Sequence, residues 1–349
     1  MRAIAILTMV VGHGMVLLKK VFPATADVYM PNGVEIFFVL SGFLIGQIIF
    51  KNISVGIFQT WAHLVHFWKF RWFRTLPNYY LILFINLSLA FWEINNQNWR
   101  LFSWKFLFFL QNFGWSFRAF FPESWSLSVE EWFYLLFPAA LILFLAFTKK
   151  HSLKWRSLFV ILLFIAVPLL LKIVRVLDEP FTDKFTWGLE IRKVVIYRLD
   201  SVIVGVLFAW FKYFYAEKFN SWRYKLLLLG LAINVFNNVF VTDYSGFYFQ
   251  AIFLVSNGFS MAALIPFFDN IRIGSGIFYR TMTYISIVSY AVYVVHFSIV
   301  LSIFIKWVDF STVPNALVAY AAYWLITFGL SHILYKYYEK PMTDLRSKF

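Results

Sequence analysis

Long apolar segments recur from one end of the chain to the other, and they constrain its fold more than any other feature. A helix that crosses the hydrocarbon core of a bilayer, about 30 Å thick, needs about 20 mostly apolar residues. Hydrophobic residues make up 61% of the chain and charged residues 14%, against about 45–50% and about 25% in soluble domains. We therefore predict an all-α integral membrane protein and exclude intrinsic disorder. Ten segments read as transmembrane helices: 2–20, 33–50, 77–93, 126–147, 155–173, 194–215, 223–241, 248–268, 284–305 and 314–336.

The basic residues, which give the chain a net charge of +14, predict its orientation. With the N-terminus inside, the inner segments carry 18 of the 31 Lys and Arg residues and the outer segments carry 10. This bias places both termini in the cytoplasm, and it explains the charge without nucleic acid as a partner. The apolar piece from Trp104 to Trp115 is too short to cross, so we expect a re-entrant or interfacial helix there. One membrane domain, 1–349, is predicted for the whole chain.

The first segment carries Arg2 and His13, two groups that are costly inside a bilayer. Eleven residues advance a helix by about 1100° and about 16 Å, so both side chains lie within roughly 20° of one face. Arg2 is expected at the cytoplasmic surface, where a guanidinium suits a phosphate-bearing ligand. His13 is expected deep in the membrane, where an imidazole can act as a general base on a hydroxyl. The alternatives are an anchoring arginine and a hydrogen-bonded packing histidine.

The second segment carries Glu35 near its outer end, within reach of His13 if the first two helices are antiparallel neighbours. A carboxylate on the imidazole would fix its tautomer and raise its basicity, so we predict His13 and Glu35 as a catalytic pair. Ser41, Gly42 and Gly46 are small residues one turn apart. They suit close helix packing, and they would also let an acyl chain or a pantetheine arm pass.

Segment 61–77 is amphipathic, aromatic and basic, which predicts a helix in the membrane interface. Arg71 and Arg74 lie on one face of it. They are either topology anchors or a clamp for the phosphates of a nucleotide or coenzyme A. The chain has no cysteine, and two nearby histidines without further ligands are weak support for a metal site, so none is predicted.

Three further polar groups lie in or beside apolar segments. Ser128 and Glu131 have the spacing of a capping box, which leaves Glu130 free at the outer mouth to bind a sugar hydroxyl. Arg198 and Asp200 form either a mutual ion pair or a ligand contact. His296, in the ninth segment, is either a hydrogen-bonded packing residue or a second functional histidine.

These residues, in this order, resemble the membrane acyltransferase-3 family, which O-acylates cell-surface polysaccharides and other extracytoplasmic acceptors. The resemblance covers essentially the whole chain. It rests on Arg2-x10-His13, Gly33-Val34-Glu35 with 37–44, Arg71-x-x-Arg74 before Pro77, 125–131 (Trp-Ser-Leu-Ser-Val-Glu-Glu), Arg198-Leu199-Asp200, 290–296 and 337–341 (Tyr-Tyr-Glu-Lys-Pro).

The resemblance implies a membrane enzyme that uses acyl-coenzyme A, most commonly acetyl-coenzyme A, as a co-substrate and holds no permanent cofactor. The donor would bind from the cytoplasm, and His13 would act as base or acyl carrier for an acceptor hydroxyl of an extracytoplasmic glycan or lipid-linked saccharide. The donor site would comprise Arg2, Arg71, Arg74 and Ser41. The acceptor site would comprise Trp125, Ser126, Glu130, Arg198, Asp200 and His296.

Two other functions stay open. A transporter or flippase for a lipid-linked saccharide would explain the buried charges, but such proteins usually show internal repeats and broken helices, which the sequence lacks. A membrane sensor or scaffold would not need an arginine and a histidine on one stripe. For the enzyme we expect the cytoplasmic (inner) membrane as its location.

Overall fold

The computed structural model describes residues 1–26, 30–56, 60–118, 120–148, 152–271 and 274–348, a part of the chain that is helical and without strands. Six helical stretches in it are long and apolar enough to cross a membrane: Gly33–Ser54, Ser124–Phe147, Leu153–Asp178, Tyr248–Asp269, Ile277–Trp307 and Val313–Asp344. Each overlaps a predicted span, so the predicted all-α membrane class is confirmed.

The helices follow the order of the predicted spans. They are α1 (Arg2–Gly14), α2 (Gly33–Ser54), α3 (Trp61–Phe91), α4 (Ser124–Phe147), α5 (Leu153–Asp178), α6 (Lys184–Trp187), α7 (Leu199–Phe214), α8 (Ala216–Ser221), α9 (Arg223–Val235), α10 (Phe253–Ala263), α11 (Ile265–Asp269), α12 (Ile277–Val295), α13 (Ser302–Trp307), α14 (Val313–Leu334) and α15 (Lys340–Asp344). The four predicted spans outside the six long stretches fall on α1, α7 and α9, which have 13, 16 and 13 residues, and on α3, whose 31 residues include a polar and basic first half.

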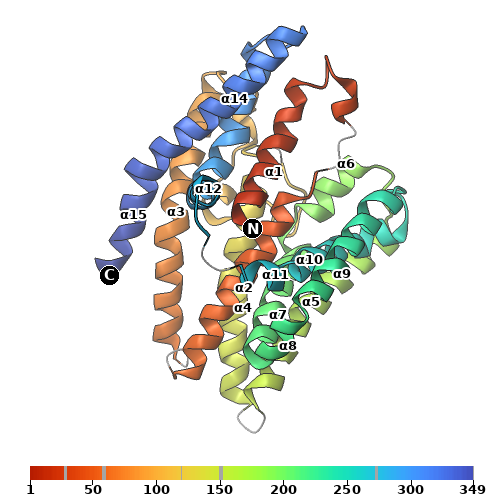
Figure 1. The fold of residues 1–349 in the computed structure, drawn as a ribbon, viewed down its shortest axis with the longest axis vertical. Coiled ribbons are helices and arrows are strands. Elements are labelled where there is room, and N and C mark those ends of the chain that lie inside the picture. Colours follow the sequence, from red (N-terminus) through yellow and green to blue (C-terminus); the bar gives the residue numbers. More distant parts are fainter. Residues whose placement is uncertain (27–29, 57–59, 119, 149–151, 272–273, 349) are drawn as a thin grey trace.

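Helices α1 and α2 lie in the middle of the bundle between two groups of helices (Figure 1). One group contains α3, α12 and α14, and the other contains α5, α7, α9 and α10. Helix α1 packs against α2 and α12, while α2 packs against α4, α7 and α10. The chain begins inside the bundle (Figure 1), where the side chains of Ala5, Ile6 and Val10 are fully buried. Arg2 is half-buried at the start of α1 and lines a cleft described below, and its expected place at the cytoplasmic surface stays a prediction.

Two predicted segments have a different form in the structure. Residues 61–77 are not a separate interfacial helix, because α3 runs unbroken from Trp61 to Phe91 with Pro77 inside it. The piece from Trp104 to Trp115 contains only a short 3-10 helix, Trp104–Phe108, followed by turns. Side chains of α3 and α4 hold its backbone: Tyr79 donates to the carbonyl of Phe106 (2.8 Å), and Trp132 donates to that of Phe109 (2.9 Å). Polar side chains thus satisfy irregular backbone that is buried in protein.

Close packing of α2 on α7 sets the centre of the bundle. A Cβ on Gly42 would clash with the backbone carbonyl of Val202, and a Cβ on Gly205 would clash with that of Val39. Small residues let two helix backbones approach in this way, as the sequence predicted for Gly42. Because α2 also carries Glu35 and Ser41, its packing on α7 fixes the position of both side chains along the axis of the bundle.

Replacing Gly42 with alanine is expected to destabilise the fold by about 1–3 kcal/mol, the usual cost of forcing extra volume into a packed core. The measurement is thermal unfolding of the purified protein in detergent. Gly329→Ala on α14 is the matched control, because no described atom outside the adjoining backbone of α14 lies within 4 Å of the added Cβ. Equal unfolding temperatures for the two variants would contradict the close α2–α7 contact.

Candidate active site

Three arginines converge on a cleft between α1, α2, α3 and α7. The cleft has a volume of about 590 Å³ and is lined by Arg2, Arg71, Arg74, Lys51 and Lys212, with no carboxylate among its described lining residues. Within the described part of the chain, the guanidinium groups of the three arginines form no ion pair. A set of unpaired cations of this kind suits an anionic ligand such as a phosphate.

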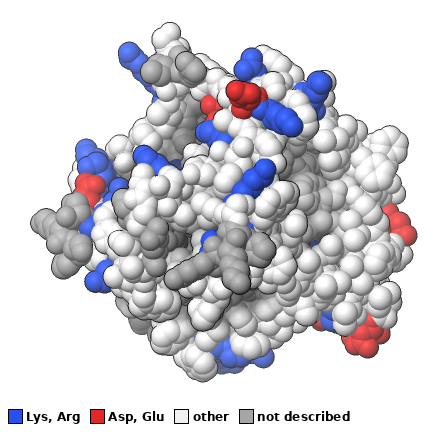
Figure 2. All heavy atoms as spheres, turned by 90° about the horizontal axis from the view of Figure 1, so that it is seen from below, with Lys and Arg blue, Asp and Glu red and all other residues white. Residues whose placement is uncertain are grey.

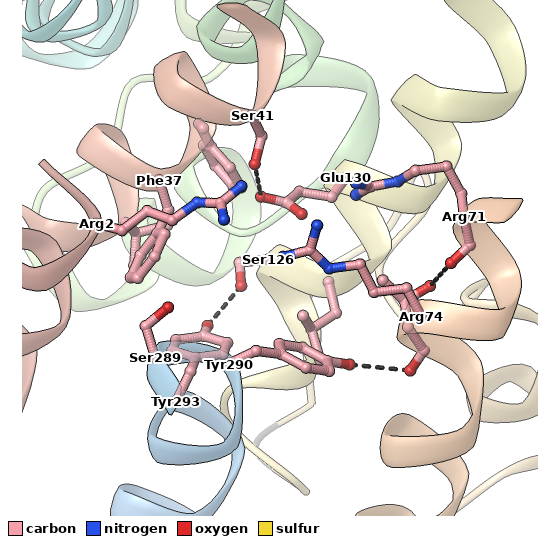
Figure 3. Close-up of a pocket in the computed structure, with 14 residues that line it drawn as sticks. Arg2, Phe37, Ser41, Arg71, Arg74, Ser126, Glu130, Ser289, Tyr290 and Tyr293 are labelled. Carbon is pink, nitrogen blue, oxygen red and sulfur yellow. Dashed lines mark hydrogen bonds between the residues drawn. The ribbon is translucent and has the colours of Figure 1, made fainter. Parts of the chain in front are cut away.

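The cleft continues into a narrow cavity of about 80 Å³. Ser41 and the three arginines line both spaces. Arg2 reaches into the narrow cavity from one side and Arg71 and Arg74 reach in from the other, with Glu130 between them (Figure 3). The deeper lining is Ser126, Ser289, Tyr290 and Tyr293. The cleft is therefore several times larger than the narrow cavity into which it leads.

Glu130 belongs to this arginine-lined cavity, so its predicted place at the outer mouth is wrong. Its carboxylate accepts hydrogen bonds from Ser41 (3.0 Å) and Tyr134 (3.0 Å). The capping box is also wrong, because α4 begins at Ser124 and Ser128 bonds to the carbonyl of Ser124 within the helix (3.1 Å). The helix starts earlier than the sequence pattern suggested, which places Glu130 about 9 Å into α4.

Neighbouring side chains hold the arginine face of α3 in position. The Arg71 guanidinium lies over the ring of Tyr134, 4.0 Å from its centre, a cation–π contact. Thr75, one turn further along α3, donates to the carboxylate of Glu131 (2.7 Å), and Tyr290 of α12 donates to the carbonyl of Thr75 (3.0 Å). Contacts from α4 on one side and from α12 on the other therefore fix the part of α3 that carries the arginines.

His13 pairs with His296 rather than with Glu35. Its Nδ1 lies 2.9 Å from His296 Nε2, and the two rings are stacked with centres 5.1 Å apart. Nδ1 of His296 faces only carbonyl oxygens, those of Tyr293 (2.7 Å) and Val292 (3.1 Å), so it must carry the proton. In the neutral pair His296 Nε2 then accepts from His13 Nδ1–H, and His13 Nε2 keeps its lone pair. His296 performs the orienting role that the sequence assigned to a carboxylate.

The backbone around His296 is itself irregular. Residues His296–Leu301 form a π-helical segment between α12 and α13, and such bulges are frequent at functional sites. Glu123, just before α4, accepts a hydrogen bond from the backbone N–H of Ser298 in this segment (2.7 Å). The segment is thereby tied to the start of α4, which keeps the imidazole of His296 against that of His13.

Two buried ion pairs, which the sequence did not predict, contain Glu35, Arg198 and Asp200 together with Lys172. Glu35 accepts from Arg198, and Asp200 accepts from Lys172 of α5. All four side chains are fully buried. The mutual Arg198–Asp200 pair is therefore wrong, as is the contact of Glu35 with His13. A substrate role for Arg198 and Asp200 finds no support, because their charges are met by partners on other helices.

A second polar cavity, of about 270 Å³, lies beyond His13. His13 lines it together with Arg192, Lys184 and several asparagines. We call it the outer cavity, because it lies on the other side of the narrow cavity from the arginine cleft, and Val34 lines both it and the narrow cavity. His13 thus stands where the two cavities approach each other. Trp125, a predicted acceptor residue, is buried beside Phe38 with Arg192 over its ring at 5.9 Å.

Several residues of the site were missed by sequence reasoning. Arg192 was counted only as a topology charge, and Tyr293 has no feature that sets it apart from the chain's other tyrosines. The Tyr293 hydroxyl lies 2.5 Å from that of Ser126, and both side chains line the narrow cavity. Ser126, predicted for the acceptor, therefore lies on the arginine side. The only available signal for Tyr293 was its spacing of three residues before His296.

Comparison with known proteins identifies the family of the chain. A family model described as an acyltransferase domain matches residues 1–336. Peptidoglycan O-acetyltransferase OatA of Listeria monocytogenes is 34% identical over 138 residues, which cover 35% of this chain and 21% of that protein. The match thus spans about a fifth of that relative's length. No solved structure matches. The chain is a multi-pass membrane protein that belongs to the acyltransferase-3 family.

Proposed function

We propose that the protein transfers an acetyl group from cytoplasmic acetyl-coenzyme A to a hydroxyl of an extracytoplasmic glycan or lipid-linked saccharide. One observation carries the proposal: the arginine cleft, the narrow cavity, His13 and the outer cavity follow one another through the bundle. The relative named as a peptidoglycan O-acetyltransferase supports acetyl as the group and a wall polysaccharide as the acceptor.

The proposal includes ten membrane crossings in the cytoplasmic membrane, with both termini inside. The excess of basic residues in the predicted inner segments supports this orientation. Figure 2 views the lower end of the bundle in Figure 1, and on this face Lys and Arg outnumber Asp and Glu. Lys51 and Lys212 also line the arginine cleft, so the donor enters the bundle from the basic side.

The donor binds with its phosphates on Arg2, Arg71 and Arg74 and its pantetheine arm in the narrow cavity. Guanidinium groups bind phosphate through paired hydrogen bonds, and among the described residues no carboxylate forms an ion pair with any of these three. The serine and tyrosine hydroxyls that line the narrow cavity suit the amide groups of the arm.

His13 acts as the general base. Its Nε2 takes the proton of the acceptor hydroxyl while the oxygen attacks the thioester carbonyl; the carbon–sulfur bond breaks, and the coenzyme A thiolate leaves and takes up the proton. The hydrogen bond from His13 Nδ1 to His296 supports this role, since it leaves the Nε2 lone pair available. The alternative is an acyl carrier at Nε2. Labelled acetyl retained on the protein when the acceptor is omitted would indicate that route.

Replacing Arg71 and Arg74 with glutamine is expected to raise the KM for acetyl-coenzyme A by about tenfold or more, because each charged hydrogen bond contributes about 1.5–3 kcal/mol. The acceptor KM should change little. The measurement is initial-rate transfer of labelled acetyl in membranes. Lys69→Gln is the control, an exposed cation on the same helix that lines neither cavity. An unchanged donor KM would leave the arginines as topology anchors.

A transporter for a lipid-linked saccharide would also use a path through the bundle. Saccharide export that stops in a deletion strain, together with no acetyl transfer by any variant, would favour it. Transfer of label from acetyl-coenzyme A to membrane glycan would exclude a purely transporting role.

A further inference from the structure

Arg192 is a cation of the outer cavity whose charge is not met by a partner. It ends the π-helical segment Gly188–Arg192 and lies over the ring of Trp125. In the described part of the chain its guanidinium forms no ion pair and no hydrogen bond, whereas nearby Arg175 and Arg198 each bind a carboxylate. A guanidinium left without an anion beside a cavity is available to a ligand.

The buried charges around Arg192 do not cancel. Lys172 is neutralised by Asp200 and Arg198 by Glu35, and both pairs are fully buried. Glu35 is a carboxylate whose charge acts on Arg192, yet its hydrogen bond goes to Arg198. Arg192 therefore remains as the surplus positive charge of this cluster.

The lining of the outer cavity increases this surplus. Lys184 is the second cation there, and the described lining residues include no aspartate and no glutamate. Next to Arg192, burial and the neighbouring guanidinium lower the pKa of Lys193 to about 8, so of these two adjacent cations Arg192 is the one that keeps its charge at any working pH. The cavity therefore binds an anionic group more favourably than a neutral one.

The other lining groups suit a saccharide. They include amide side chains, among them Asn238 and Asn257, and aromatic rings, among them Trp187 and Phe249. Amides bind sugar hydroxyls as donors and acceptors, and aromatic rings supply an apolar wall. His13 lines the same cavity, so a sugar bound here presents its hydroxyl to the base.

We propose that Arg192 selects an acceptor saccharide that carries a carboxylate or a phosphate close to the hydroxyl that is acylated. This inference rests on the proposed function, because it names the class of acceptor for that reaction. Arg192 is then a specificity-determining residue, and its loss should affect acceptor binding and leave donor binding unchanged.

The test uses three soluble acceptors: a disaccharide ending in glucuronic acid, the matched disaccharide ending in glucose, and that glucose disaccharide carrying a phosphate. Transfer from labelled acetyl-coenzyme A is measured for wild type, Arg192→Gln, Arg192→Lys and the control Arg118→Gln, which lies outside the outer cavity. The expected result is a KM about tenfold to hundredfold lower for an anionic acceptor than for the neutral one. That advantage should vanish in Arg192→Gln, persist in part in Arg192→Lys and be intact in the control. Comparison of the uronate with the phosphate identifies the preferred anion.

Equal KM values for charged and neutral acceptors in wild type would overturn the inference while leaving the acetyltransferase in place. An equal fall of kcat on all acceptors in Arg192→Gln would overturn it too, since the residue would then act on the reaction itself. A separate binding experiment measures how the uronate disaccharide shifts the unfolding temperature of the purified protein. An Arg192-dependent shift without any acetyl transfer, even to native membranes, would support the inference about binding and contradict the proposed function.

Discussion

Replacing His13 with alanine is expected to lower kcat for acetyl transfer by about 10²–10⁴-fold, the range that a positioned general base contributes. His13 lines the outer cavity, and its Nδ1 faces His296 Nε2 at 2.9 Å, so its Nε2 is the basic atom left for a hydroxyl. The variant should fold, because the lost side chain lies beside a cavity. The measurement is label transferred from acetyl-coenzyme A to membrane glycan, normalised to folded protein.

The controls separate chemistry from folding. His66→Ala removes an exposed histidine of α3 and should leave transfer unchanged. His296→Ala should cost less than His13→Ala, and His296→Gln should recover part of the loss, because its amide oxygen can accept from His13 Nδ1–H. The double variant His13→Ala with His296→Ala should be no worse than His13→Ala alone, since the residues act as a unit. Transfer retained by His13→Ala would remove it as the catalyst.

The groups at the centre of the site could be predicted from the sequence because ionisable side chains are rare in apolar segments. Arg2 and His13 stand out for this reason, and their spacing on one helix predicts a common face. Arg71 and Arg74 likewise stand out by their spacing on one helix. Such inferences stay within one helix, where geometry follows from residue number alone. The structure places all four side chains on the cavities, with the three arginines together.

The partners of these groups could not be predicted, because they depend on which helices pack together and at what height. Arg198 and Glu35 are 163 residues apart in the chain, and only the contact of α2 with α7 makes them neighbours. His296 approaches His13 because α1 packs on α12 and on the π-helical segment that follows it. Periodicity within a segment says nothing about these contacts. The sequence therefore offered Glu35 to His13 because the two residues lie on consecutive predicted spans.

Replacing Glu35 with methionine is expected to destabilise the protein by about 3–5 kcal/mol, the cost of leaving a buried charge without its partner. Arg198 is fully buried, and two of its guanidinium nitrogens already lack a hydrogen-bond partner in the described part of the chain. Without the carboxylate the guanidinium would have no compensation in the bundle. Thermal unfolding in detergent, followed by the loss of monodisperse protein on size exclusion, measures the effect.

The double variant Glu35→Met with Arg198→Met separates the structural role of Glu35 from a catalytic one. Replacing a buried ion pair by apolar side chains of similar volume is often neutral or stabilising, so the double variant should recover most of the lost stability. Because His13 is oriented by His296 and not by Glu35, the recovered protein should also transfer acetyl groups at close to the wild-type rate. A double variant as stable as wild type but inactive would contradict this assignment and return Glu35 to the catalytic machinery.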